Sequence, residues 1–228
     1  MVRTWILAVT VLMAAGASLA CRLGTVRSGQ VRTIEFCGSA FQLDTRWVTC
    51  TSGDVADLSP LAELKDLRNL FVLNSPVTDL SPLAEMSSLR VLALNGTQVV
   101  DLSPLSGLGA LISLGLNFTQ VADLSPLSEL SSLSELQLSA TQVTDLRPIA
   151  GLGNLSHLGL IGTPVSDLSP LSGLTGLTEI YLGRSQVTDP TPLSSLVGLR
   201  TLNLESTPVS PVEIEALRRA LPNCEITY

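Results

Sequence analysis

Three residue types return at a constant spacing of 22 residues through most of the chain. The aspartates are Asp57, Asp79, Asp101, Asp123, Asp145, Asp167 and Asp189. The prolines are Pro60, Pro82, Pro104, Pro126, Pro148, Pro170 and Pro192, and the valines run from Val55 to Val209 at the same interval. A period kept this strictly is typical of a solenoid, in which each repeat packs only on its neighbours. We therefore expect a stack of similar units.

Residues 79–100 show how one unit is expected to fold. The pattern LxxLxL predicts a strand with one buried face, because alternation is the period of a half-buried strand; its leucines are Leu89, Leu92 and Leu94. Upstream, Ser81 is expected to cap a short helical turn with Pro82 at its first position, where a missing N–H costs nothing. One unit cannot bury its own leucines, so stacked units must bury them together.

The segments DLSPLAEL (57–64) and LNGTQVVDLSPL (94–105) resemble the leucine-rich-repeat family, and specifically its 22-residue internalin-like class. The resemblance covers roughly residues 45–210. It implies an α/β solenoid: a leucine-rich-repeat arc with a parallel sheet on the concave face and short helical turns on the convex face. It also implies a binding module. One departure is Pro190, which replaces the leucine that follows aspartate in the other repeats and is expected to loosen the stack.

The two ends of the chain depart from the repeat. We assign a signal peptide to residues 1–20, an N-terminal cap to 21–44, the repeats to 45–209 and a C-terminal cap to 210–228. A strand is expected over residues 31–36. Ser210 and Glu213 form a capping-box pattern, which predicts an amphipathic helix to about Ala220 and a closing strand within 221–226.

The first residues indicate export. Arg3 precedes a short apolar run, which ends in the small-residue site Ser18-Leu19-Ala20. A membrane span is the alternative, but the run is shorter than the roughly 20 residues that a span needs. Cleavage after Ala20 leaves Cys21 first, which resembles a bacterial lipobox, although Ser18 stands where that motif prefers leucine. The expected location is extracellular, periplasmic or lipid-anchored at the outer surface.

Composition and motifs narrow the function. The chain has a formal net charge of −7, and loss of Arg3 with the signal makes it more acidic still, so nucleic acid is not an expected partner. A membrane is expected to be contacted only through a lipid on Cys21. The sequence has no Gly-rich phosphate loop, no Cys-x-x-Cys and only one histidine. We therefore expect no catalytic residue, no cofactor and no metal. A regulatory subunit or a structural cell-envelope protein is the alternative to an exported binding module.

The cysteines divide by position. Cys37 and Cys50 both fall near the N-terminal cap and are predicted to form a disulfide. Cys224 falls at an expected core position of the last strand, on the order of 40 Å away, and is too distant to pair with them. Alternatively, all four cysteines are reduced, or Cys21 takes part in the pair.

The positions beside the strand leucines are the candidate binding residues, because they point away from the core. Reading the repeats in register places four aromatic residues there: Trp47, Phe71, Phe118 and Tyr181. One column of successive strands holds Arg46, Arg68 and Arg90. Aromatic and arginine side chains are common interface anchors, so this patch suits an acidic protein or a glycan. The alternatives are scattered surface aromatics and local pairing of the arginines with Asp44 or Asp54.

Two carboxylate patterns have a structural and a functional interpretation. The repeated aspartate suits a hard cation such as calcium, but a backbone N–H bound by aspartate in every turn explains it more simply. Glu135, His157 and Glu179 form another column. Three ligands in a straight row do not converge well on one ion, so we interpret them as an ordinary charged surface.

Overall fold

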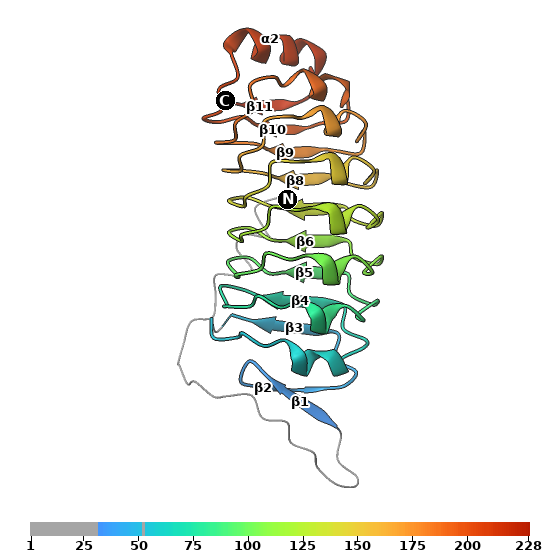
Figure 1. Ribbon diagram of the computed structural model, residues 1–228. Coiled ribbons are helices and arrows are strands. Elements are labelled where there is room, and N and C mark those ends of the chain that lie inside the picture. Colours follow the sequence, from blue (N-terminus) through green and yellow to red (C-terminus); the bar gives the residue numbers. More distant parts are fainter. Residues whose placement is uncertain (1–31, 52) are drawn as a thin grey trace.

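The computed structural model describes residues 32–51 and 53–228, so the predicted signal segment and Cys21 lie outside the described residues. Nine strands form one sheet in sequence order, and each pairs in parallel with the next at an offset that matches one repeat (Figure 1). The strands are β3 (Trp47–Cys50), β4 (Asn69–Val72), β5 (Val91–Ala93), β6 (Ser113–Gly115), β7 (Glu135–Gln137), β8 (His157–Gly159), β9 (Glu179–Tyr181), β10 (Thr201–Asn203) and β11 (Glu225–Thr227).

Single 3-10 turns form the other face of the stack (Figure 1). They are η1 (Ser59–Glu63), η2 (Ser81–Leu83), η3 (Ser103–Leu105), η4 (Ser125–Leu127), η5 (Arg147–Ile149), η6 (Ser169–Leu171) and η7 (Thr191–Ser195). The α/β leucine-rich-repeat solenoid is therefore confirmed. The expectation that Ser81 caps its turn is wrong, because the residue at the cap of η2 is Leu80 and no side chain caps it.

The repeated aspartate supplies the bond that the serine does not. In all seven repeats its carboxylate accepts the backbone N–H of the residue two positions later, at 2.8 or 2.9 Å. Asp123 and the Ser125 N–H are typical of the set. This bond fixes the chain as it enters each 3-10 turn. The structural interpretation of the aspartates is confirmed.

Replacing Asp123 with alanine is expected to lower the melting temperature by roughly 2–4 °C, as for the loss of one local cap in a chain of this length. Asp123→Asn is the matched control, because its amide oxygen still accepts the Ser125 N–H. Differential scanning calorimetry compares the two variants. Equal losses for both would show that the carboxylate charge matters and not the hydrogen bond.

The aspartates also predict how stability depends on pH. In six repeats, the pKa of the aspartate carboxyl group is lowered below its ordinary value. The main cause is a hydrogen bond from the side chain of the residue two positions later, and the second is the bond from the backbone N–H of that residue. The six aspartates are Asp57, Asp101, Asp123, Asp145, Asp167 and Asp189. A lowered native pKa contributes stability that is complete above the unfolded pKa and is lost as the pH falls through the native pKa.

The melting temperature is therefore expected to hold down to about pH 4.5 and to fall below that value. A triple variant with asparagine at Asp101, Asp123 and Asp145 should show a shallower fall, because an amide keeps the turn bond and does not titrate. Acid titrations of both proteins, followed by circular dichroism, make the comparison. Parallel curves would contradict the assignment.

The core is one continuous column of aliphatic side chains. Leu92, Leu114 and Leu136 face one another on adjacent strands and are fully buried, as are their equivalents along the stack. A buried threonine follows each of four strands, and its hydroxyl donates to the carbonyl three residues earlier; these are Thr97, Thr119, Thr141 and Thr163. Each of these four repeats is thus closed by its own polar bond as well as by apolar contact.

Pro190 does not loosen the stack, so that expectation is wrong. Its ring is buried, and its carbonyl accepts the Leu193 N–H at 3.0 Å in the same manner as the leucines of other repeats. The adjacent strands β9 and β10 keep the regular parallel register. Proline keeps its carbonyl, and the bond that begins the turn needs only that carbonyl.

Both ends of the stack are closed. At the N-terminal end, β1 (Thr33–Phe36) and β2 (Ser39–Gln42) form an antiparallel hairpin, and a disulfide joins Cys37 to Cys50 of β3 with Cα atoms 5.8 Å apart. At the other end lies α2 (Pro211–Ala220), which begins with the predicted capping box of Ser210 and Glu213.

Cys224 lies just before β11 and is half-buried, so its expected place within the last strand is wrong. The core runs without interruption from the hairpin to this end. The described residues therefore form one folded unit that is capped at both ends.

Candidate functional site

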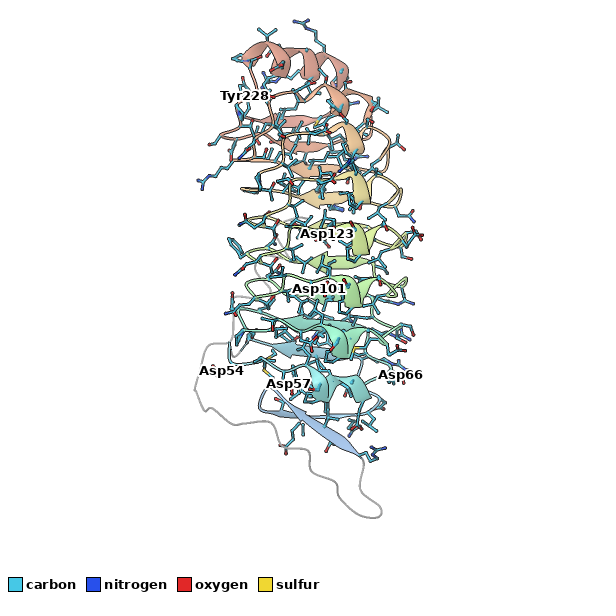
Figure 2. The ribbon with its side chains drawn as sticks, in the orientation of Figure 1. Asp54, Asp57, Asp66, Asp101, Asp123 and Tyr228 are labelled. Carbon is cyan, nitrogen blue, oxygen red and sulfur yellow. A yellow bond between two sulfur atoms is a disulfide. The ribbon has the colours of Figure 1, made fainter. Side chains whose placement is uncertain are left out.

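The sheet presents one row of outward side chains from each strand. In β3, for example, Val48 and Cys50 are buried while Trp47 and Thr49 point outward. Each strand is offset from the next by one repeat, so equivalent outward residues form columns across the strands. Within a column, neighbouring residues are about 4.8 Å apart. We call this surface the sheet face; Figure 2 shows the side chains along the whole stack.

The three arginines form one column immediately before the strands. The N–H of Arg68 donates to the Arg46 carbonyl at 3.0 Å, and that of Arg90 donates to the Arg68 carbonyl at 2.8 Å, which places the three residues in one line. All three side chains are exposed. Among the described residues, none of them has an ion pair or a side-chain hydrogen bond. The alternative that Asp44 or Asp54 neutralises this column is therefore wrong.

Two aromatic rings lie beside the arginines. The rings of Trp47 and Phe71 are stacked with centroids 4.9 Å apart and an interplanar angle of 28°. The Trp47 indole N–H donates to the Thr49 hydroxyl at 2.8 Å, which fixes the ring, yet 55% of the residue remains exposed. Phe71 is half-buried, so the pair offers one exposed ring held on a second one, and such a fixed ring loses little entropy when a partner covers it.

Small residues follow Phe71 along the sheet face. In the same column the next two strands carry Ala93 and Gly115. The Asn95 side chain lies so close to Gly115 that a Cβ there would stand 3.1 Å from its amide oxygen. That same oxygen accepts the Asn117 N–H at 2.8 Å. The aromatic pair therefore borders a shallow floor of small residues and an ordered amide.

Phe118 does not belong to the sheet face, and its expected place there is wrong. It lies in the loop after β6, three residues beyond the strand, and is 70% exposed. Its φ of +58° is in the left-handed region, and every repeat from Asn74 to Ser206 has a left-handed residue at the same place. The local spacing alone did not distinguish this loop position from a strand position.

Tyr181 lies on the sheet face but is engaged in a polar network. Its hydroxyl donates to the Glu179 carboxylate at 2.8 Å, and the other Glu179 oxygen lies 3.5 Å from His157 Nε2. The Ser156 hydroxyl lies 2.8 Å from His157 Nδ1. Burial, and then the bond to Glu179, raise the pKa of Tyr181 to about 12.

The predicted column placed His157 beside Glu179, and that contact is present, but sequence reasoning missed the bond from Tyr181. Glu135 instead accepts a bond from the Ser113 hydroxyl at 3.0 Å. The described residues contain no group of three or more side chains arranged to hold a metal ion. The C-terminal half of the sheet face thus holds a bonded network around Glu179, although Arg200, in the same column as the three arginines, is exposed there without an ion pair among the described residues. The N-terminal half has three such arginines in succession beside the stacked rings.

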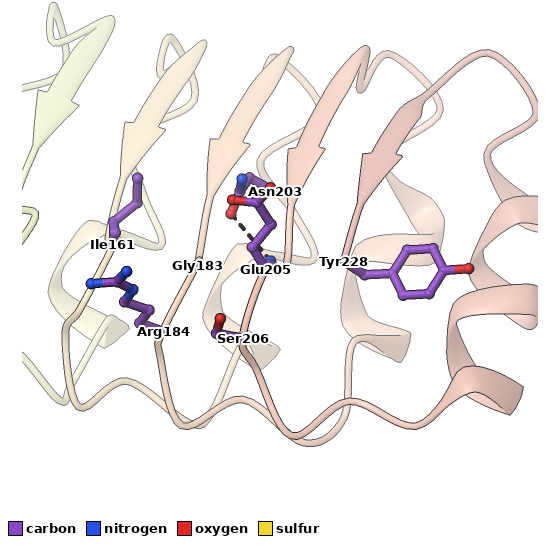
Figure 3. A pocket seen from close by; sticks show the side chains of 7 residues that line it. All are labelled: Ile161, Gly183, Arg184, Asn203, Glu205, Ser206 and Tyr228. Carbon is purple, nitrogen blue, oxygen red and sulfur yellow. Dashed lines mark hydrogen bonds between the residues drawn. The ribbon is translucent and has the colours of Figure 1, made fainter.

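A shallow hollow of about 320 Å³ lies near the C-terminal end (Figure 3). Arg184 and Glu205, from adjacent repeats, border it, together with Gly183 and Asn203. Tyr228 forms one wall, while the Arg218 guanidinium lies 4.8 Å from the centre of its ring. We assign no ligand to the hollow.

The predicted site residues therefore separate into three places. Arg46, Trp47, Arg68, Phe71 and Arg90 come together at the N-terminal end of the sheet face. The other two predicted residues lie elsewhere, Tyr181 in the polar network and Phe118 in a loop. No helix within residues 32–51 and 53–228 has the length and apolar content to span a bilayer.

The strand-and-turn repeat, the parallel sheet and the two caps define a leucine-rich-repeat solenoid. No family model and no curated protein matches the sequence. Among solved structures, internalin C2 of Listeria monocytogenes is 30% identical, with 83% of this chain and 85% of that chain covered and a TM-score of 0.78. The chain belongs to the internalin-like family of leucine-rich-repeat proteins.

Two further structures are similar. The internalin InlF of Listeria monocytogenes is 29% identical, and the two structures match with a TM-score of 0.71. The match covers 81% of this chain and 61% of the InlF chain. A leucine-rich-repeat protein of Leptospira interrogans, 22% identical, covers 79% of this chain and 60% of its own length at a TM-score of 0.60, which shows the shared fold. Internalin-like repeats are generally protein-interaction modules.

Proposed function

We propose that this protein is an exported binding module that holds an acidic protein surface against the N-terminal half of its sheet face. The observation that carries the proposal is the unpaired column of Arg46, Arg68 and Arg90 on a chain with a net charge of −7. Like charges stacked on adjacent strands repel one another unless an anion lies nearby. An anionic partner relieves that repulsion, and the column steers it to one place.

The aromatic pair supplies the apolar contact. Trp47 is exposed and held by Thr49, and Phe71 stacks on it, so the pair offers a fixed anchor beside the cations. Ala93 and Gly115 follow Phe71 in the same column, and the Asn95 side chain lies against Gly115, so a polar amide stands beside the rings. The expected ligand is a protein segment in which acidic residues flank one large apolar residue.

Selection from a random peptide library on residues 32–228 tests this proposal. Enriched peptides should carry aspartate or glutamate beside an apolar residue. Trp47→Ala or Phe71→Ala should each weaken the binding free energy of the selected peptides by about 2 kcal/mol, as for interface anchors. Arg68→Glu should shift the selection toward basic peptides, because it reverses the charge at the centre of the column.

Arg219→Glu is the matched control, since it makes the same charge change on an exposed residue of α2 far from the column. It should leave the selected peptides unchanged. Peptides without an acidic bias, or an equal effect of both reversals, would place the site elsewhere.

Export is the second part of the proposal. It is supported by the apolar segment after Arg3 and by the disulfide between Cys37 and Cys50, since disulfides persist in oxidising compartments. A lipid on Cys21 would hold the protein at a membrane. In a bacterial host, Cys21→Ser should move the protein from the membrane fraction to the soluble exported fraction. Wild-type protein already free in the medium would exclude the anchor and leave export intact.

A further inference from the structure

The arginine column continues beyond Arg90 into an apolar residue. Ile112 takes the next place, because its N–H donates to the Arg90 carbonyl at 2.8 Å, just as the N–H of Arg90 donates to the Arg68 carbonyl. The Ile112 side chain is 38% exposed. Ser134 follows it, and the Ser134 hydroxyl donates to the Ile112 carbonyl at 3.2 Å. A partner that lies along this column therefore meets three cations in succession and then one apolar side chain.

The spacing of the column constrains the backbone of that partner. Neighbouring strands are about 4.8 Å apart, so three successive arginines extend over roughly 9.6 Å. On an α-helix, residues i, i+3 and i+7 share one side and extend over roughly 10.5 Å. On an extended chain, residues i, i+2 and i+4 share one side and extend over roughly 13 Å. The helix differs from the column by about 1 Å, which flexible arginine side chains can absorb, whereas the extended chain differs by more than about 3 Å.

Two neighbours of the column also favour a helix. Trp47, next to Arg46, is 55% exposed. A flat partner sheet laid on the column would meet this ring first, whereas a cylindrical helix can lie beside it. Asp44 and Asp66 are exposed as well, and each lies two residues before an arginine of the column, Arg46 or Arg68. A chain that is acidic on all sides would oppose these aspartates, whereas a helix confines its carboxylates to one stripe.

We propose that the partner presents an α-helix that lies lengthwise on the column. Its carboxylates, at positions i, i+3 and i+7, face Arg46, Arg68 and Arg90, and an apolar residue one turn beyond this stripe faces Ile112. The arginines are exposed and without an ion pair among the described residues, so they are free to bind it. This inference rests on the acidic ligand proposed above and adds the form of its backbone and the spacing of its charges.

Three alanine-rich peptides of about 18 residues, long enough to be helical in water, serve as probes. The striped peptide carries glutamate at i, i+3 and i+7 and a leucine one turn beyond each end, so that it can bind in either direction. The shifted peptide has the same composition, but its middle glutamate stands at i+5, on the opposite side of the helix. The proline peptide keeps all three glutamates and carries proline at i+5, which breaks the helix.

Fluorescence anisotropy at low salt measures the affinity of the protein for each labelled peptide, and circular dichroism checks that the striped and shifted peptides are equally helical. The shifted peptide should bind about three- to fivefold more weakly than the striped one, as for the loss of one exposed ion pair. The proline peptide should bind at least tenfold more weakly, because its carboxylates no longer share one side of a helix.

Arg68→Ala tests which arginine faces the middle glutamate. It should weaken the striped peptide about three- to fivefold and leave the shifted peptide unchanged, because the shifted glutamate does not face Arg68. Arg219→Ala is the matched control, since it makes the same change on an exposed residue of α2 and should alter neither affinity.

The outcomes separate this inference from the proposal on which it rests. If the striped and shifted peptides bind equally and Arg68→Ala weakens both, or if the proline peptide binds as well as the striped one, the ligand is acidic but not a helix on this column. The helix is also wrong if none of the three peptides binds while acidic peptides from the library do. If no acidic peptide of either kind binds in a manner that depends on Arg68, both proposals fail.

Discussion

Replacing Leu136 with alanine is expected to lower the free energy of unfolding by about 3–5 kcal/mol. The side chain is fully buried at the middle of the stack, between Leu114 and Leu158 on the adjacent strands. The lost apolar contact and the cavity both contribute, because each neighbour is fixed by its own repeat and closes the space only in part.

The position of Leu136 adds a second effect. Each repeat contacts only its neighbours, so weakening one interior interface uncouples the two arms of the stack. Chemical denaturation followed by circular dichroism should show a lower midpoint and a broader transition. Val197→Ala removes an exposed apolar group and should change stability by less than about 0.5 kcal/mol. A Leu136 variant that unfolds like this control would contradict the described core.

Loss of the disulfide is expected to have the next largest effect, about 3 kcal/mol in the chain-entropy model for a closed loop of this length. The bond joins Cys37 and Cys50, which are 13 residues apart, and ties the β1–β2 hairpin to the first strand of the sheet. Replacing both cysteines with alanine should therefore destabilise the N-terminal cap before the rest of the stack. Hydrogen exchange of the β1, β2 and β3 amides measures this local loss.

The same variant connects stability to binding. β3 also carries Trp47, whose ring stacks on Phe71. A loosened cap should therefore separate the two rings and lower the affinity for the proposed acidic ligand. Cys224→Ser, at the far end, should affect neither property. If amide hydrogens along the whole stack lost their protection from exchange equally, the disulfide would stabilise the entire fold and not the N-terminal cap alone.

The arginines of the sheet face are unevenly distributed along the stack. Arg46, Arg68 and Arg90 lie on successive repeats at the N-terminal end, whereas Arg200 is a single arginine of the same column at the other end. Between them, Glu179 and Tyr181 are bonded to each other. We therefore expect an acidic ligand to prefer the N-terminal end, where the positive charges are consecutive.

The sequence by itself determined the repeat and everything that one repeat encodes. The spacing of Asp123 and Ser125, the LxxLxL strand and the capping box at Ser210 each depend on neighbours a few residues away. Local bonds of this kind recur wherever the same residues recur, so reading one unit predicts all of them. That is why the fold, the aspartate turns and the last helix could be predicted from the sequence.

The tertiary structure decided what happens between repeats. Arg68 has no acidic side chain alongside it in the adjacent repeats, whereas Glu179, which accepts the Tyr181 bond, faces His157 from one repeat away. Phe118 lies on a loop because every repeat bends into the left-handed region there, which the sequence marks with glycine only at Gly96 and Gly162. Side-chain partners and backbone direction depend on the packed neighbours, whereas the repeat spacing records only the common core.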